Sequence, residues 1–560
     1  MATNQQRPWP HATSPDAVSD EVFDVAHVDG FFASTQPTSS PSSTSAGCLF
    51  PQLPHPAVPS VARPLASDEL LGTQRYYFLR LFWDTCHPLL QVMSEVEFAA
   101  LSALPPITIF DEYLAQNALV DVMLALGMQN SHTTGLAGRI LGHQQPPSRK
   151  YYNAAPSPEV SWPGFEYFDR CRDCMRTYTE ITLEVLRCHA LMIIYFMKGN
   201  AFRDAYNLLG ITIRKAYIAK LHRPPPSHMS DAEKTAHMQL WWMLFSLDVQ
   251  CSLQLDMPAA SQKSLVKCPL PTDDGLARYV SPSNTRDERL SPFVYTTCLA
   301  KLAVIVTDIT ACFSTADLDE DDSSNPDTLE HHALRLSSTL QALEVWHDEI
   351  PPELRLDHCG EGSGNAEGLD FDRDLSLPIW LRRQRVLLEL YYHNAYTLIQ
   401  RPFIRRDYTH SGDPSVTIPP PDSQLPQTEL HITSAVHHAT VVVDIVFSVC
   451  STSEVLYGWT EVLQPLWNAI MTITAHAFGK SLRSGAPRAL DSLTRAQAVI
   501  ESFSSTCPSA RSAKGIVQSL VSSLPSMMIQ GSSTAPNDDQ LSWDFLTSIF
   551  EEESRNLYLA

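Results

Sequence analysis

Hydrophobic residues recur along most of this chain with the spacing of an α-helix. Within residues 386–400, Leu387, Leu390, Tyr391 and Leu398 fall on one stripe of a helix with 3.6 residues per turn. Strand-like alternation is weak, so the pattern predicts an all-α fold, a large irregular multi-helix array. The same helical spacing occurs in 74–82, 114–127, 168–197, 202–220, 232–253, 294–313, 329–346, 433–450, 461–478 and 490–503.

Stretches rich in proline, glycine, serine and aspartate separate the periodic segments. Twenty-four of the first 65 residues are proline, serine or threonine, and such a segment cannot bury enough apolar surface to offset its chain entropy. We therefore predict a disordered region over 1–65, a helical domain over 66–525, and a linker with an acidic amphipathic tail over 526–560. Loops are expected near 130–162, 254–292, 314–327, 355–377, 405–428 and 526–540.

The charge of the chain limits which partners it can bind, and its cysteine content indicates the compartment. The 40 basic and 62 acidic side chains give a net charge of −22, which repels the phosphates of nucleic acid, so any contact with DNA requires a basic patch or a partner. Twelve cysteines are too few for a disulfide scaffold and indicate a reducing compartment. The most apolar helix, 293–313, carries Lys301 and Asp308 on one face, so we expect no membrane segment.

The sequence offers no recognisable catalytic or metal site. It contains no complete phosphate-binding loop, no His-Glu-x-x-His run and no Gly-x-Ser-x-Gly turn. Cys171 and Cys174 have the gap of a zinc pair, but Cys188 and His189 would lie about 20 Å away if 168–197 is one continuous helix. We therefore expect no catalytic residue, no cofactor and no metal ligand.

The most specific pattern in the chain lies in residues 216–271. Ser230 and Glu233 have the spacing of a capping box, which starts a helix. On that helix Trp241 and Asp248 share a mostly apolar face. A carboxylate in such surroundings needs a hydrogen-bond donor, so the predicted role of Asp248 is to hold the following loop, in preference to a ligand contact.

This order of residues resembles the fungal-specific transcription factor domain, the middle homology region of fungal binuclear zinc-cluster regulators. Further along, a helix ending in Trp-x-x-x-x-Pro at Trp346 fits the family, and the segment from Leu390-Tyr391-Tyr392 to Arg401-Pro402-Phe403 looks like its Tyr-…-Leu-x-Arg-Pro-Phe helix end. The resemblance implies structural roles for the matching residues, which are His222, Arg223, Trp241, Trp242, Asp248, Pro258, Arg401 and Pro402.

The chain departs from the family pattern in three places. Residues 237–239 replace the usual arginine pair before the two tryptophans, and Asp256-Met257 replaces the glycine before Pro258. The family's DNA-reading module holds two zinc ions with six closely spaced cysteines, whereas only Cys48 lies among the first 85 residues. We therefore expect either a DNA-binding partner or a zinc cluster lost from the start of the sequence.

The tail offers a second functional hint. Acidic residues alternate there with bulky apolar ones, which is the composition of an acidic activation segment that docks in a coactivator groove. The alternative is a terminal helix that packs its aromatic face on the body. The residues suited to either role are Trp543, Phe545, Leu546 and Phe550.

Together these features predict a nuclear transcription regulator of a metabolic or secondary-metabolite gene set. The resemblance implies partners of three kinds: a DNA-binding factor or a second copy, a coactivator, and a small-molecule effector. Two other hypotheses stay open. One is a cytoplasmic adaptor that inhibits a related factor, and the other is a helical enzyme with an unfamiliar site near Asp248, His393 or Asn394.

Overall fold

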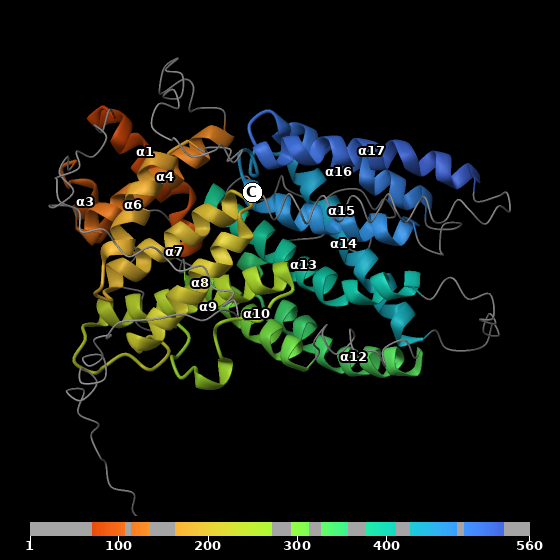
Figure 1. Ribbon diagram of the computed structural model, residues 1–560, viewed down its shortest axis with the longest axis horizontal. Helices are drawn as coiled ribbons and strands as arrows, with labels where there is room; N and C mark the ends of the chain where they lie inside the picture. Colours follow the sequence, from red (N-terminus) through yellow and green to blue (C-terminus); the bar gives the residue numbers. More distant parts are fainter. Residues whose placement is uncertain are drawn as a thin grey trace, which may run out of the picture. The chain divides into compact units, whose positions relative to one another are not determined.

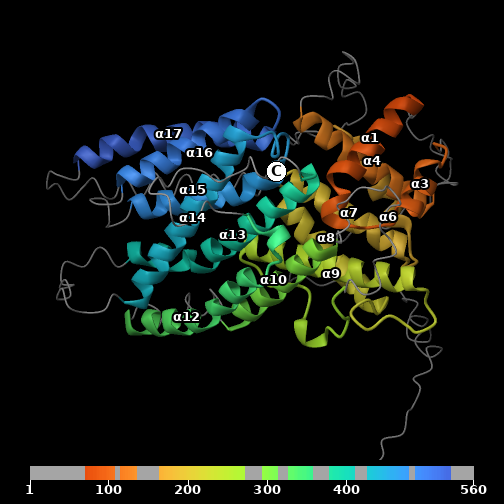
Figure 2. The same cartoon turned by 180° about the vertical axis from the view of Figure 1, so that it is seen from behind.

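The computed structural model describes residues 70–106, 114–134, 163–271, 293–312, 326–356, 377–409, 426–478 and 486–530. Within these ranges the regular elements are α-helices and short 3-10 helices, with no strand, so the predicted all-α class is confirmed. The expected disordered region 1–65 and the aromatic residues of the tail lie outside the described residues (Figures 1 and 2).

The first group of helices surrounds α4. Residues 118–131 of α4 are buried all round, against α1, α6 and α7. The single acid in this stretch, Asp121, receives two hydrogen bonds from Arg170 of α6, at 2.8 and 2.7 Å, so its charge is paired. The helices are α1 (Gly72–Thr85), α2 (His87–Leu90), α3 (Glu95–Ser102), α4 (Ala115–Thr133), α6 (Phe165–Thr177), α7 (Leu183–Lys198), α8 (Phe202–Ile218) and α9 (Asp231–Leu255).

The second group is a stack of long helices in which α14 packs against α12, α13, α15 and α16 (Figure 1). Its side chains connect to the first group through Asn468 of α15, which hydrogen-bonds Gln254 of α9 and Asn394 of α13. The elements are η3 (Lys263–Leu265), α10 (Phe293–Cys312), α12 (Pro326–Asp348), η6 (Pro352–Leu354), α13 (Ile379–Thr409), α14 (Gln427–Thr452), η8 (Thr460–Val462), α15 (Leu463–Phe478), α16 (Ala486–Ser504) and α17 (Pro508–Gln530).

Three predicted boundaries were wrong. The expected helix over 168–197 is two helices, because Thr182 caps a new one and its hydroxyl accepts a hydrogen bond from the Val185 N–H. The helix expected to end at Pro402 continues through it to Thr409, held by Phe403, which stacks on His431 of α14. Serine-rich α17 was not predicted, and it occupies the first residues of the expected loop 526–540.

Two helices, α10 and α14, are long and apolar enough to cross a membrane by length and composition. In α10, 39% of the most apolar window is buried, and in α14, 44%. Both pack against at least three other helices, as the core helices of a helical domain do. The expectation that the chain has no membrane segment stays a prediction.

Helices α1 and α4 approach each other closely at Gly127. A Cβ atom at this position would lie 2.2 Å from the carbonyl oxygen of Phe78, which belongs to the backbone of α1. We expect Gly127→Ala to lower the free energy of unfolding by about 1–3 kcal/mol, because the two backbones must move apart. Urea unfolding followed by circular dichroism measures this change.

The matched control is Gly515→Ala in α17, where an added Cβ meets nothing within 4 Å. Removing a helical glycine there should stabilise the protein by about 0.5–1 kcal/mol. Equal effects at the two positions would contradict the close approach of α1 and α4.

Candidate functional site: an anchored loop beside an apolar groove

The corner between α8 and α9 is set by local sequence. Ser230 and Glu233 form the predicted capping box at the start of α9: the Glu233 N–H donates to the Ser230 hydroxyl at 3.3 Å, and the Ser230 N–H donates to the Glu233 carboxylate at 2.8 Å. Helix α9 therefore begins at Asp231 and carries its two tryptophans into the core.

Asp248 anchors the loop that follows α9. Its side chain is fully buried, and its carboxylate accepts a hydrogen bond from the Ser261 N–H at 2.7 Å. Burial raises the pKa of this carboxyl above its ordinary value. Trp242 holds the far end of the loop, since its indole N–H donates to the Pro269 carbonyl at 2.9 Å. This geometry is the structural role that the sequence pattern predicts for Asp248.

Helix α8 holds the same loop from the other side. The backbone carbonyl of His222 accepts hydrogen bonds from the N–H groups of Lys267 and Cys268, at 2.8 and 2.9 Å. The Tyr217 hydroxyl accepts from the Gln262 N–H at 2.8 Å. Near the start of the loop, the Tyr206 hydroxyl donates to the Pro258 carbonyl at 2.8 Å. Residues 258–269 are thus fixed to the helices at several points.

The motif residues at this corner pack against one another. The ring of His222 lies 4.8 Å from the ring of Tyr217 and 5.9 Å from that of Trp241. The Arg223 carbonyl is 3.2 Å from a ring nitrogen of His237. Arg401 and Pro402 are not part of this cluster, because they lie on α13.

Two backbone positions at this corner have left-handed conformations. Lys220 after α8 has φ of +60°, and Asp256 after α9 has φ of +55°. The family pattern has glycine at the first position and a glycine just before Pro258 at the second. Glycine adopts a positive φ without steric strain, whereas other residues do so at a cost of about 1–2 kcal/mol. This chain therefore keeps the turns without the glycines.

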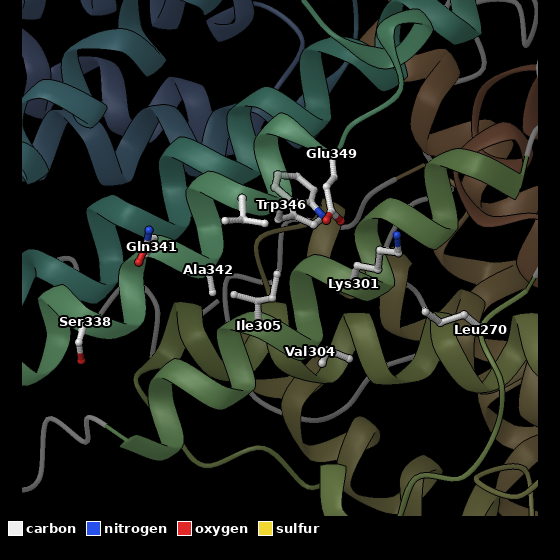
Figure 3. A pocket seen from close by; sticks show the side chains of 10 residues that line it. Leu270, Lys301, Val304, Ile305, Ser338, Gln341, Ala342, Trp346 and Glu349 are labelled. Carbon is white, nitrogen blue, oxygen red and sulfur yellow. The ribbon is translucent and has the colours of Figure 1, made fainter.

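The loop ends beside an apolar groove between α10 and α12 (Figure 3). The groove has a volume of about 550 Å³, within the size range of ligand sites. The Trp346 ring is fixed in the wall because its N–H donates to the Cys298 carbonyl at 3.0 Å. Sequence reasoning missed this groove. Its lining residues are Leu270, Lys301, Val304, Ile305, Ser338, Gln341, Ala342, Val345, Trp346 and Glu349.

Positive and negative side chains lie on opposite sides of the groove. On the α10 side, Lys301 lines it, and Asp308, two turns further along the same face, pairs with Lys263 of the anchored loop. On the α12 side the lining residue is Glu349. The two charged side chains that line the groove are therefore Lys301 on the α10 side and Glu349 on the α12 side.

A chain of buried ionisable side chains joins α12, α13 and α14. The carboxylate of Glu389 lies 3.1 Å from the Nε2 of His347 and 3.2 Å from that of His393, and the Nδ1 of His393 lies 2.6 Å from the Nδ1 of His438. A carboxylate only accepts, so His393 donates from Nε2 and, when neutral, accepts at Nδ1 from His438. Asn394 is satisfied by Asn468. Each group thus has a partner in the core.

One sequence-based distance argument about cysteines was wrong. Because the chain breaks between α6 and α7, the helices pack against each other and Cys171 lies within hydrogen-bonding reach of Cys188. Burial and the neighbouring thiol raise the pKa of Cys171 well above its ordinary value. No group of three or more His, Cys, Asp or Glu side chains suited to a metal occurs in the part of the chain that the structure describes.

Comparison with known proteins identifies the class of this domain. Residues 79–348 match the model of the fungal specific transcription factor domain. The resemblance drawn from residues 216–271 is therefore confirmed.

Curated relatives match over a longer stretch. The chain is 30% identical over 515 residues to the oosporein cluster regulator OpS3 of Beauveria bassiana, covering 86% of this chain and 64% of that protein. It is 25% identical over 431 residues to the terreic acid cluster-specific transcription factor atF of Aspergillus terreus, covering 73% and 61%. It is 26% identical over 478 residues to the transcription factor asqA of Emericella nidulans, covering 83% and 77%. The chain thus spans less than two thirds of the first two relatives.

Asp248 provides a direct test of the anchored loop. We expect Asp248→Ala to lower the free energy of unfolding by about 2–4 kcal/mol, because the Ser261 N–H loses its acceptor and a cavity is left. Trypsin should then cleave faster after Lys263 and Lys267. Asp248→Asn keeps an acceptor oxygen, so the free energy of unfolding should fall by less than half as much as in Asp248→Ala. Urea unfolding and mass spectrometry of the tryptic peptides measure both effects.

The control is Asp173→Ala on α6, a half-exposed carboxylate in an i,i+3 pair with Arg176, which should change stability by less than about 0.5 kcal/mol. If Asp248→Ala left cleavage after Lys263 and Lys267 unchanged, the carboxylate would not be the anchor.

The histidine chain should make the protein less stable in acid. Burial lowers the pKa of His438 to about 3 and also lowers that of His393. Burial would raise the pKa of Glu389, but hydrogen bonds from His347 and His393 hold it at about 2. The unfolded chain binds protons that the folded one does not, at the two histidines below about pH 6.5 and at Glu389 below about pH 4.5. The free energy of unfolding therefore falls by about 1.4 kcal/mol per pH unit for each group within its own range.

Between pH 6 and 4, His438→Gln should reduce the slope of the free energy of unfolding against pH by the contribution of one proton, about 1.4 kcal/mol per pH unit. His331→Gln, an exposed histidine on α12, is the control and should leave the slope unchanged. Urea unfolding at a series of pH values measures the slopes. An unchanged slope in the His438 variant would show that this histidine is already charged in the folded protein.

Proposed function

We propose that this protein is a nuclear regulator of transcription that controls a secondary-metabolite biosynthesis gene cluster. The observation that carries the proposal is the match to OpS3 over 515 residues, together with the family of residues 79–348. The names of two relatives, a regulator of the oosporein cluster and a factor specific for the terreic acid cluster, support the kind of target.

The charge of the chain favours action through protein contacts. A net charge of −22 repels DNA phosphates, so we propose that a DNA-binding partner or module provides the contact to promoters. The helical body then serves as the regulatory scaffold. The tail, with Trp543, Phe545, Leu546 and Phe550 among acids, is the proposed contact to a coactivator. The groove beside α10 has the size to take a small-molecule effector.

Deletion of the gene in its host tests this proposal. Transcripts of a biosynthetic gene cluster should fall at least about tenfold, and the full chain should restore them. Trp543→Ala with Phe545→Ala should not, because buried aromatic anchors carry most of the affinity of such contacts. RNA sequencing measures the transcripts, and immunoblotting checks that the protein is present.

The control variant is Tyr457→Ala, which removes a 64% exposed aromatic residue from the body and should restore the transcripts fully. A reporter assay separates activator from adaptor: the full chain fused to a foreign DNA-binding module should activate the reporter. No response from the reporter, together with rising cluster transcripts in the deletion strain, would favour the inhibitor hypothesis over ours.

A further inference from the structure

The groove between α10 and α12 presents an apolar surface that the described residues leave uncovered. Val345 on its α12 wall is 50% exposed, and Val304, Ile305 and Ala342 continue the apolar surface across to α10 (Figure 3). The Trp346 ring closes one side and is held by its hydrogen bond to Cys298. Such a surface fits an occupant with several large apolar side chains.

One cationic side chain lines this groove, and two more lie on the loop that ends in it. Lys301 lines it, Lys263 pairs with Asp308 on the same face of α10, and Lys267 is four residues further along the anchored loop. Lys267 and Lys301 form no ion pair with a carboxylate in the described ranges. In a protein of net charge −22, these lysines attract acidic ligands.

One segment of the same chain has the complementary chemistry. Residues 538–553 carry six acids and six large apolar side chains. The acids are Asp538, Asp539, Asp544, Glu551, Glu552 and Glu553, and the apolar residues are Leu541, Trp543, Phe545, Leu546, Ile549 and Phe550. In a docked segment, the acids would lie beside the lysines and the aromatic side chains would lie in the apolar groove. Glu349 on the other wall repels acids, so they would face the lysine side.

We propose that the groove between α10 and α12 binds residues 538–553 of the same chain and thereby covers the aromatic residues of the tail. Helix α17 ends at Gln530, so the eight residues from there to Asp538 can extend to about 26 Å and the twenty up to Phe550 to about 65 Å. Tethering raises the effective concentration to about the millimolar range, so weak contacts suffice.

The same features argue against DNA as the occupant. DNA phosphates are bound by cations with polar side chains and backbone N–H groups, whereas this groove has an apolar floor and Glu349 on one wall. An acidic peptide with large apolar side chains uses both the floor and the lysines. The regulatory consequence rests on the proposed function: a docked tail cannot reach its coactivator, so docking reduces activation in proportion to the fraction of chains that are docked.

Zero-length crosslinking of the full chain tests the docking. A carbodiimide joins carboxylates to amines that are in contact, and mass spectrometry then identifies the linked peptides. We expect peptides from 538–553 to be linked to peptides containing Lys263, Lys267 or Lys301. Mixed isotope-labelled and unlabelled chains should give links within one chain, and 0.5 M salt should weaken them.

Lys267→Glu with Lys301→Glu removes two of the reacting amines, so the readout is the link to Lys263, which should fall about tenfold. Arg488→Glu, an exposed cation on α16, is the matched control and should leave that link unchanged. Because a double charge reversal can affect folding, Ala342→Glu on the exposed face of α12 provides an independent block of the groove, and circular dichroism checks each variant. Links from the tail to lysines elsewhere, links only between chains, or no links from the tail would overturn the proposal.

The reporter fusion separates this inference from the proposed function. If both hold, the Lys267/Lys301 double variant and Ala342→Glu should raise reporter activity several-fold over the unmodified chain. If the tail is docked but is not an activator, the crosslinks are still found and the reporter stays at background. If the variants lower DNA retention without altering the tail crosslinks, the surface binds DNA and the docking proposal is wrong.

Discussion

The buried carboxylate of Asp248 is the contact on which the surface of this domain depends. It has no exposure to solvent, and its bond to the Ser261 N–H fixes the middle of a loop that has no regular structure apart from one 3-10 turn. That loop carries Lys263 and Lys267 and ends at Leu270 in the groove. A buried charge of this kind is tolerated where backbone donors satisfy it. Here a core residue thereby determines where surface charges lie.

Polar junctions of a different kind fix the relative positions of the helices. Asn468 joins α9, α13 and α15 through side-chain amides. Glu389 joins α12 and α13, and reaches α14 through His393 and His438. Apolar packing alone would tolerate small rotations of long helices, whereas a buried hydrogen bond is lost by such a rotation and leaves an unsatisfied group. These junctions give Glu389, His393, Asn394 and Asn468 hydrogen-bond partners between helices.

Lys267 and Lys301 are cations on the loop and on α10, in a protein with a net charge of −22. Repulsion between like charges keeps an acidic tail away from most of an acidic body, so the lysine edge of the groove is the place where attraction can act. A ligand that occupied the groove would compete with the tail for the same apolar surface. In the proposed arrangement, one groove would connect the binding of an effector to exposure of the tail's aromatic residues.

Local sequence predicted the all-α class and the start of α9 at Ser230, because helical periodicity and caps depend on residues only three or four positions apart. The order of residues in 216–271 carried the resemblance to the family. Local sequence could not place the break before Thr182, which no glycine or proline marks, or the continuation of α13 through Pro402, which packing of Phe403 on α14 sustains.

Only the tertiary structure brought Cys171 to Cys188, joined Glu389 to His347 of α12, and set Trp346 of α12 beside Lys301 of α10. The groove arises from residues far apart in the chain, and its shape depends on how helices cross. The sequence thus determined which residues can bind an acidic, apolar segment. Long-range packing brought these residues together, and the sequence could not show this because contacts between distant segments produce no periodic pattern of hydrophobic residues.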